Sequence, residues 1–403
     1  MRRVAITGLG VICALGNQSG EFWQALAAGR SGICPIQQLD VSRFRFRNGA
    51  EVRDYNPAIF FPDGSGDSFD RFAQFAVIAA REAVRDSGLE LKPLAERTAV
   101  VTGSCMGGQS SQDAGFVEIY AKQRERVHPL TIPRTMANAG ASQVATEFGI
   151  TGPVYTISTA CSSSNHALGQ AFWMVRNGQV EAALAGGSEA TFSFGILRAW
   201  EALRVVSPDT CRPFTRDRKG MILGEGAAML VLEPLEAARA RGARVYAEIV
   251  GFGMSSDASH ITRPDVAGAV RAMRAALQDA KVAPNDIGYI NAHGTGTAAN
   301  DVSECAAIRT LFGTHAEKLA ISSTKSMHGH TLGAAGALEA AATVLALHHG
   351  ILPPTANFTE PDPECALDVI PNTARTLQVE HALSNSFAFG GLNAALAFAR
   401  SSG

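Results

Sequence analysis

The amino-acid sequence predicts an α/β fold in which buried strands alternate with helices. Short apolar runs rich in β-branched residues, such as 154–159, are typical of buried strands. Segments with apolar residues at helical spacing, such as 72–87, separate these runs. The alternation starts again at Val245, so the chain has two halves of similar make-up, 1–244 and 245–403. Such alternation indicates α/β layers.

The first half is expected to begin with a strand and a tight turn, because Thr7, Gly8 and Gly10 interrupt the apolar run that starts at Val4. Gly186-Gly187 is expected to end one strand, and Asn177-Gly178 to end a helix whose apolar spacing begins at Ala167. The other expected elements are helices 21–28, 72–87 and 235–241, strands 99–103, 154–159 and 182–185, and a buried run 227–232.

The second half shows the same alternation up to a proline-rich loop at 353–364. Its expected strands are 245–251, 287–292, 319–322, 381–386 and 393–399, and its expected helices are 267–280, 301–311 and 334–348.

Composition excludes several classes of protein. With 403 residues, 46% hydrophobic and 18% charged, the chain is typical of globular proteins, and its net charge of −2 gives no indication of a nucleic-acid partner. Seven cysteines without a CxxC pair argue against a zinc ribbon or a disulfide framework, so we expect no metal and a reducing, cytoplasmic location. No stretch approaches the roughly 18 apolar residues of a membrane span.

Four segments that follow strands carry side chains capable of chemistry: 156–164 with Cys161, 291–297 with His293, 322–330 with Lys325 and His330, and the small-residue turn 384–391. Active sites of open α/β sheets form beyond the carboxyl ends of strands, so we expect these segments to converge. Cys161 lies where a strand turns into a helix. Unpaired backbone N–H groups and the positive end of the helix dipole should favour its thiolate there.

These segments resemble the motifs of the β-ketoacyl-acyl carrier protein synthases, a family of condensing enzymes. The resemblance extends from Ile6 to Asn393 and is greatest to the elongating synthase I/II type. Residues 160–166 and 353–357 also resemble the nodulation protein E branch. The resemblance implies a thiolase-like fold of five layers, α-β-α-β-α, with a mixed five-stranded sheet in each half.

The resemblance also implies catalytic roles. Cys161 resembles the acyl-accepting nucleophile, and His293 and His330 resemble the histidines that promote decarboxylation of a malonyl thioester. Lys325 resembles the lysine that orients this network, and Glu304 resembles its acidic partner. Residues 301–304 also match a capping box for the following helix, which would give Glu304 a structural role.

The resemblance further implies residues that bind the substrates. The backbone N–H groups of Cys161 and Phe389 resemble an oxyanion hole, and Phe389 resembles a gate for the acyl chain. Residues resembling pantetheine contacts are Thr262, Thr295 and Thr297, and those at acyl-pocket positions are Met106 and Trp200.

Three features depart from the family pattern. His328 stands where the family usually has threonine, and the family's spacing of five residues from the lysine to the histidine implies that His330 is the catalytic one. Ala388 replaces a usual glycine in the gate loop, which should slow the loop because alanine reaches fewer backbone conformations. Residues 62–70 are acidic where relatives often carry basic residues. A basic rim for an acidic carrier protein is instead expected from Lys122, Arg124, Arg126, Arg204, Arg212, Arg216 and Arg218.

The sequence therefore predicts an enzyme that condenses malonyl-acyl carrier protein with an acyl-enzyme thioester. The phosphopantetheine would arrive on the carrier protein, so we expect no cofactor held by the enzyme itself. The expected assembly is a homodimer, or a heterodimer with a related synthase subunit. Two alternatives stay open. A non-catalytic partner subunit of the chain-length-factor kind would typically lack the cysteine. A CoA-dependent thiolase would need a second cysteine near the C-terminus, and none follows Cys365.

Overall fold

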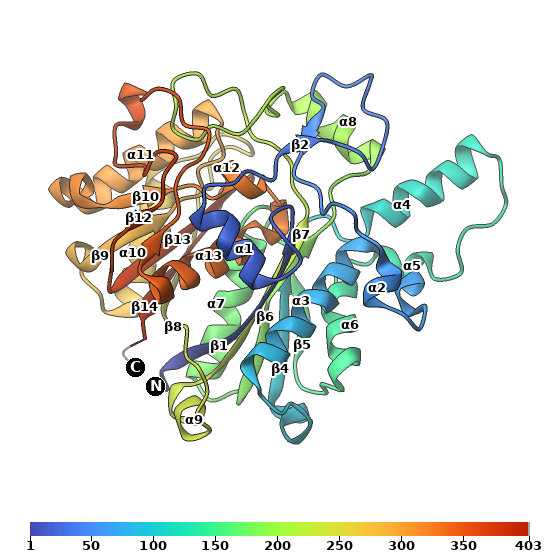
Figure 1. Ribbon diagram of the computed structural model, residues 1–403, viewed down its shortest axis with the longest axis horizontal. Helices are drawn as coiled ribbons and strands as arrows, with labels where there is room; N and C mark the ends of the chain where they lie inside the picture. The colour runs from blue at the N-terminus through green and yellow to red at the C-terminus, as the bar shows by residue number, and fades with distance from the viewer. Residues whose placement is uncertain (402–403) are drawn as a thin grey trace.

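The computed structural model describes residues 1–401 and places five strands from each half in one mixed sheet (Figure 1). The first half supplies β1 (Val4–Cys13), β4 (Thr98–Gly103), β5 (Val154–Ile157), β6 (Ala182–Glu189) and β7 (Gly226–Pro234). The second half supplies β8 (Ala247–Ser256), β9 (Ile287–Asn291), β10 (Ala320–Ser322), β13 (His381–Ala388) and β14 (Leu392–Arg400). Two small sheets pair β2 (Cys34–Pro35) with β3 (Asn48–Gly49) and β11 (Ile351–Leu352) with β12 (Arg375–Thr376).

The two halves have the same topology. The strand orders are β5-β4-β6-β7-β1 and β10-β9-β13-β14-β8, so in each half the third, second, fourth, fifth and first strands lie side by side. The first three strands of each order are parallel to one another, and the remaining two pairings are antiparallel. β1 also pairs with β8 over three residue pairs, which joins the two predicted five-stranded sheets into one of ten strands.

Helices cover both faces of each half-sheet and complete five layers. The central layer is α7 (Ser163–Arg176) and α13 (Ala335–His349), which contact each other and strands on either side. α13 is apolar on almost every face and is buried from Ala335 to Leu347, as a central helix must be. α3 (Arg71–Ser87) packs outside the first half-sheet, and α10 (Val266–Ala280) packs outside the second.

The remaining helices lie around these layers. They are α1 (Ser19–Ala27), α2 (Pro57–Phe60), α4 (Gln109–Phe116), α5 (Thr131–Thr135), α6 (Ala139–Phe148), α8 (Phe194–Leu203), α9 (Leu235–Ala240), α11 (Ala298–Phe312) and α12 (Lys325–His328). Short helical turns are η1 (Ser65–Ser68), η2 (Lys92–Arg97), η3 (Val117–Ala121), η4 (Pro284–Asp286), η5 (Gly313–Lys318), η6 (Leu332–Ala334) and η7 (Pro363–Cys365). No helix within residues 1–401 has the length and apolar character needed to cross a membrane.

The expected end of a strand at Gly186-Gly187 is wrong, because β6 continues through both glycines to Glu189. A Cβ on Gly186 would lie 2.0 Å from the carbonyl oxygen of Ala228 on β7, and one on Gly187 would lie 2.1 Å from the Ser164 hydroxyl on α7. The glycines thus permit close packing within the layers instead of ending the strand.

Gly186→Ala should therefore destabilise the protein by about 1–3 kcal/mol, as overpacking of a core does. The control is Gly20→Ala in α1, where an added Cβ meets no atom within 4 Å and helix propensity improves. Urea unfolding of both variants compares them. A Gly186→Ala protein as stable as Gly20→Ala would contradict this account of the β6–β7 contact.

Candidate active site

Cys161 is held in a strained turn between β5 and α7. Ala160, just before it, has a φ of 52°, in the left-handed region that non-glycine residues rarely adopt. The Ser163 hydroxyl donates to the Ala160 carbonyl at 2.6 Å and accepts the Thr159 N–H at 2.9 Å. The Ser162 hydroxyl reaches the Leu392 carbonyl of the second half at 2.8 Å. The thiol is thereby fixed where the two halves meet.

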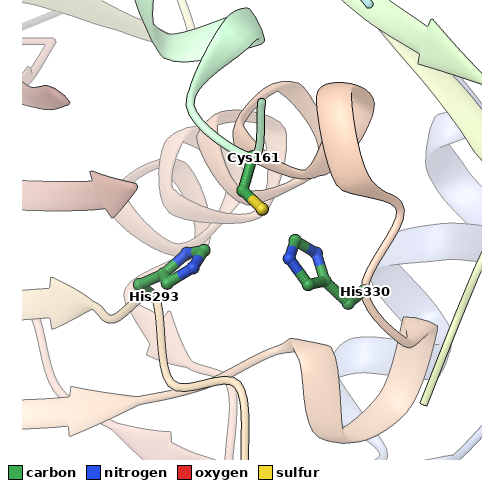
Figure 2. Close-up of side chains that lie close together, drawn as sticks. All are labelled: Cys161, His293 and His330. Carbon is green, nitrogen blue, oxygen red and sulfur yellow. The ribbon is translucent and has the colours of Figure 1, made fainter. Parts of the chain in front are cut away.

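The second half brings two histidines to this thiol (Figure 2). His293 follows β9, and His330 follows α12, where its backbone N–H donates to the Ile222 carbonyl at 2.7 Å. Cys161 Sγ and one ring nitrogen of each histidine lie within 4.8 Å of one another. The two rings are almost perpendicular, with centroids 5.4 Å apart. The predicted convergence of these segments is therefore present in the fold.

Hydrogen bonds to Nδ1 define which nitrogen of each histidine carries the proton. Lys325 Nζ lies 3.2 Å from His293 Nδ1, and the Leu332 N–H donates to His330 Nδ1 at 3.3 Å. Both partners are donors, so each Nδ1 accepts and each Nε2 carries the hydrogen. Burial and the charge of Lys325 lower the pKa of both histidines well below the usual value, which keeps them neutral at pH 7. Each ring therefore offers one N–H donor.

The predicted pairing of Lys325 with Glu304 is wrong. Lys325 is fully buried, forms its ion pair with Glu339 of α13, and also donates to the His293 carbonyl at 2.6 Å. Glu304 instead accepts the backbone N–H groups of His293 at 2.9 Å and Gly294 at 2.8 Å, which positions the histidine. α11 starts at Ala298, so the alternative capping box at 301–304 is not formed either.

Glu339 is the residue that sequence reasoning missed. It is the one acidic residue of α13, a helix whose composition is otherwise mostly apolar. A carboxylate inside such a helix is almost always paired when buried. That signal was available in residues 335–347, but Lys325, fourteen residues before Glu339, could not be identified as its partner from spacing alone. Asp257 and Asn393, which hydrogen-bond at 2.6 Å beside the cavity, were missed as well.

Backbone N–H groups favour the thiolate of Cys161, as expected, but burial outweighs them. Burial raises the pKa of Cys161 to about 11. The positive charge of Lys325 and the backbone N–H groups of Phe389 and Cys161 lower that pKa but recover only part of the cost of desolvation. The same two N–H groups lie close enough to the sulfur to act on its pKa, and such donors can bind an oxyanion on a thioester carbon.

One cavity extends from this thiol to the surface. Cys161, His293 and His330 lie at its buried end, and Thr262 is exposed at its mouth. The other predicted substrate contacts that line it are Thr295, Thr297, Trp200 and Phe389. The Phe389 ring stacks on Trp200 with centroids 6.2 Å apart, so these two aromatic side chains form one wall.

Three other residues lie outside this cavity. Met106 packs against the neighbouring apolar cluster that includes Phe192 and Leu197, so its predicted place in the pocket lining is not seen. The ring of His328 is buried, with Nε2 3.0 Å from the Thr324 hydroxyl and Nδ1 2.8 Å from the Gly329 carbonyl. His166 bonds to the Thr159 hydroxyl at 3.0 Å. Neither histidine lines the cavity.

Cys161, His293 and His330 also form a set of donors that Zn²⁺ accepts. A metal there would use the thiol and both Nε2 positions, the groups that the family resemblance assigns to catalysis. The expectation of a metal-free site stays a prediction.

Comparison with known proteins identifies the family. The model of the beta-ketoacyl synthase N-terminal domain matches residues 1–238, and that of the C-terminal domain matches residues 246–359. Nodulation protein E of Rhizobium sp. (strain N33) is 47% identical, covering 98% of this chain and 99% of the relative. 3-oxoacyl-[acyl-carrier-protein] synthase 2 of Coxiella burnetii is 44% identical, covering 99% of both.

Two solved structures extend the similarity to three dimensions. The ishigamide ketosynthase/chain length factor aligns with a TM-score of 0.95 at 40% identity over 99% of both chains. A type II polyketide ketosynthase in complex with its acyl-carrier protein (AntDE:AntF) aligns with a TM-score of 0.88 at 32% identity over 99% of both chains.

The fold and the buried cysteine with its two histidines define a thiolase-like condensing enzyme of the acyltransferase class. More particularly, the chain belongs to the β-ketoacyl synthase family. The predicted family, fold class and enzyme class are thereby confirmed.

A buried thiol with a pKa of about 11 should react slowly with iodoacetamide at neutral pH. The thiolate fraction is roughly one in 10,000 at pH 7 and one in 100 at pH 9, so alkylation of Cys161 should accelerate about 100-fold between these values without a plateau. Mass spectrometry of the Cys161 peptide follows the rate. In urea the same thiol should level off near pH 9, whereas a plateau below pH 8 in the folded protein would contradict the raised pKa.

Proposed function

We propose that this enzyme elongates an acyl chain by two carbons in a decarboxylative Claisen condensation on acyl carrier protein. The observation that supports it best is the buried thiol within 4.8 Å of two neutral imidazoles and beside two backbone N–H groups. Relatives named 3-oxoacyl-[acyl-carrier-protein] synthase 2 support the same reaction.

The first step transfers the acyl group to Cys161. The sulfur attacks the thioester carbon of acyl-carrier protein, and the N–H groups of Cys161 and Phe389 stabilise the oxyanion. The tetrahedral intermediate then breaks its bond to the pantetheine sulfur. The proton of the Cys161 thiol passes to that sulfur, so the step releases carrier protein with a free thiol.

The second step generates the carbon nucleophile. The bond between the malonyl α-carbon and its carboxylate breaks, CO2 leaves, and the electron pair becomes the enolate of the thioester. The Nε2–H groups of His293 and His330 donate to the enolate oxygen. Because both rings are neutral, they stabilise this charge without giving up a proton.

The third step forms the new carbon–carbon bond. The α-carbon of the enolate attacks the acyl carbon on Cys161, and the same pair of backbone N–H groups binds the second oxyanion. The intermediate expels Cys161 as a thiolate, which takes up a proton because its pKa lies far above neutral. The product is 3-oxoacyl-carrier protein.

The chemistry uses no cofactor held by the enzyme. The phosphopantetheine arm of the carrier protein would lie in the cavity, with the hydroxyls of Thr262, Thr295 and Thr297 along its path from the exposed mouth to Cys161. A cytoplasmic location fits the seven free cysteines, which a reducing compartment would keep unpaired.

A dimer fits an apolar arm that projects from the body of the molecule at residues 109–136 (Figure 1). This arm comprises α4, η3 and α5, and several of its large apolar side chains are exposed, among them Phe116, Tyr120 and Ile132. Such a surface is typical of a protein–protein interface. The similar ishigamide structure, described as a ketosynthase/chain length factor, makes a related synthase subunit as suitable a partner as a second copy.

The two alternative functions fit less well. A non-catalytic partner subunit has no use for a complete set of Cys161, His293 and His330. A thiolase requires a second cysteine at the site. Cys105 is close enough to feel the charge of Cys161, but burial and Glu189 raise the pKa of Cys105 well above normal.

Variants of the cysteine and of the histidines should distinguish condensation from decarboxylation. Cys161→Ala should lose condensation, because no acyl acceptor remains, but should still release CO2 from malonyl-carrier protein. His293→Ala or His330→Ala should keep an acylatable Cys161 and lose decarboxylation by roughly 100- to 1,000-fold, the value of one donor facing a developing charge. Acyl-enzyme mass and CO2 release measure the two activities.

His328→Ala is the matched control, because its ring is buried close by but lies outside the cavity. It should retain both activities. Loss of CO2 release in His328→Ala but not in His330→Ala would show that His328, and not His330, promotes decarboxylation.

Trp200 should limit the length of the acyl chain, since it lines the cavity together with Phe389. Trp200→Ala should shift the preferred substrate toward longer acyl chains. Met106→Ala removes a side chain of the adjacent cluster without opening this cavity and should leave the preference unchanged. Acylation rates across a series of acyl-carrier proteins measure the profile. If the preferred chain length shifted in Met106→Ala but not in Trp200→Ala, the acyl chain would lie against Met106, beyond the wall formed by Trp200 and Phe389.

A further inference from the structure

Residues 43–47 form a comb of exposed arginines over a buried aromatic base. Along Arg43-Phe44-Arg45-Phe46-Arg47 the two phenylalanines are buried and the three arginines are exposed. This alternation directs three positive charges to one side of a short segment between β2 and β3. We call Arg43, Arg45 and Arg47 the arginine comb.

The segment is fastened to α8, which lies beside it (Figure 1). The Arg198 guanidinium stacks 3.9 Å from the centre of the Phe44 ring and donates to the Arg43 carbonyl at 3.2 Å. The Arg45 backbone N–H donates to Glu201 at 2.6 Å. Phe44 also meets Phe194 edge to face at 5.6 Å. The comb is thus held by its backbone and aromatic base, which leaves its guanidinium groups free for a partner.

The local charge is strongly positive although the whole chain has a net charge of −2. Arg43 and Arg45 make no side-chain hydrogen bond to any described residue, and Arg47 makes only a 3.4 Å contact with the Ser42 carbonyl. Arg204, at the end of α8, is exposed and equally unpaired. Asp40 and Glu201 are the nearby carboxylates, and Glu201 is already paired with Arg198. Arg43, Arg45, Arg47 and Arg204 form no ion pair with any described residue, although Asp113 and Glu51 also bind to α8 and to the segment before the comb.

An apolar cluster connects the base of the comb with part of the lining of the catalytic cavity. Its base, Phe44 and Phe46, belongs to an apolar cluster with Trp200, Val205 and Met221. Those three residues line the cavity that contains Cys161. A protein bound over the comb would therefore lie over the apolar cluster that supplies part of the lining of that cavity.

The basic rim predicted from the sequence is a weaker candidate, because most of it is neutralised. Lys122 and Arg124 both pair with Glu118, Arg212 pairs with Asp209, and Arg218 pairs with Asp301 and Asp362. Among the rim residues from 204 to 218, only Arg204 forms no ion pair with a described residue. The exposed positive charges near the cavity that form no ion pair within residues 1–401 include the comb, Arg204 and Arg263, which lines the cavity itself.

We propose that the arginine comb, with Arg204, is the surface on which the acidic carrier protein docks. This inference rests on the proposed function for the identity of the partner. Exposed charges steer association and set its rate more than they stabilise the final complex, and salt screens them. The comb replaces the basic residues that the acidic segment 62–70 lacks.

The test reverses the charge of the three comb arginines in the full-length enzyme. The triple variant Arg43→Glu, Arg45→Glu, Arg47→Glu should bind fluorescently labelled malonyl-carrier protein about tenfold to a hundredfold more weakly at low salt. Its affinity should also depend less on salt than that of the wild type. The Arg→Gln triple, which removes charge without reversing it, should lie between the two and covers the case in which the reversed variant misfolds.

The matched control is the triple Arg85→Glu, Lys92→Glu, Arg97→Glu. These exposed residues precede β4 or end α3, at the opposite end of the sheet from Cys161, and should leave carrier binding unchanged. Decarboxylation of malonyl-pantetheine, which has no carrier protein, should be the same in all variants. Carrier affinity within about twofold of wild type in both comb variants, an equal loss in the control, or a loss of malonyl-pantetheine turnover would each overturn the proposal. Failure of the wild type to condense would instead refute the proposed function.

Discussion

The site depends on one buried cation. Lys325 is fully enclosed, and its ion pair with Glu339 joins α12 to the central helix α13. Removing one partner of such a pair leaves an uncompensated buried charge, so the two residues constrain each other. The same ammonium group holds the Nδ1 and the carbonyl of His293, and its charge disfavours protonation of both histidines. Lys325 thereby fixes the position of His293, the tautomer of its ring and the neutral state of both histidines.

The internal repeat explains how three distant segments reach this lysine. Each half packs its strands in the same order against the layer formed by α7 and α13, so the carboxyl ends of corresponding parallel strands occupy equivalent places in the two halves. The first half places Cys161 there after β5, and the second places His293 after β9. Ser162 and Leu392 connect the two sides directly. The repeat has no residue-level signature because packing within layers constrains strand order and size, not particular side chains.

Features that depend on local sequence patterns could be predicted from the sequence. The strand and helix periodicity located nearly all strands of the large sheet, and motif wording located Cys161, His293, Lys325 and His330. Two other features depend on long-range effects. Whether Glu304 or Glu339 faces Lys325 depends on how α11 and α13 pack, and the pKa of Cys161 depends on how completely the surrounding layers exclude water. The polar helices α4 and α5 lack an amphipathic pattern because their apolar residues are exposed, so periodicity did not predict them.

The buried groups at the site and the exposed arginines have different electrostatic roles. At rest the thiol is protonated and both imidazoles are neutral, so the reacting groups carry no charge of their own. On the reacting oxygens, negative charge develops only in the oxyanion and enolate intermediates and in the transition states that lead to them. N–H donors fixed by the fold stabilise it there, and the dry surroundings increase the contribution of each donor. The exposed arginines act in water over longer distances, where salt weakens them. On the proposed docking surface, binding of a carrier protein and catalysis on its cargo would depend on separate sets of residues, and either set could change in a related enzyme without disturbing the other.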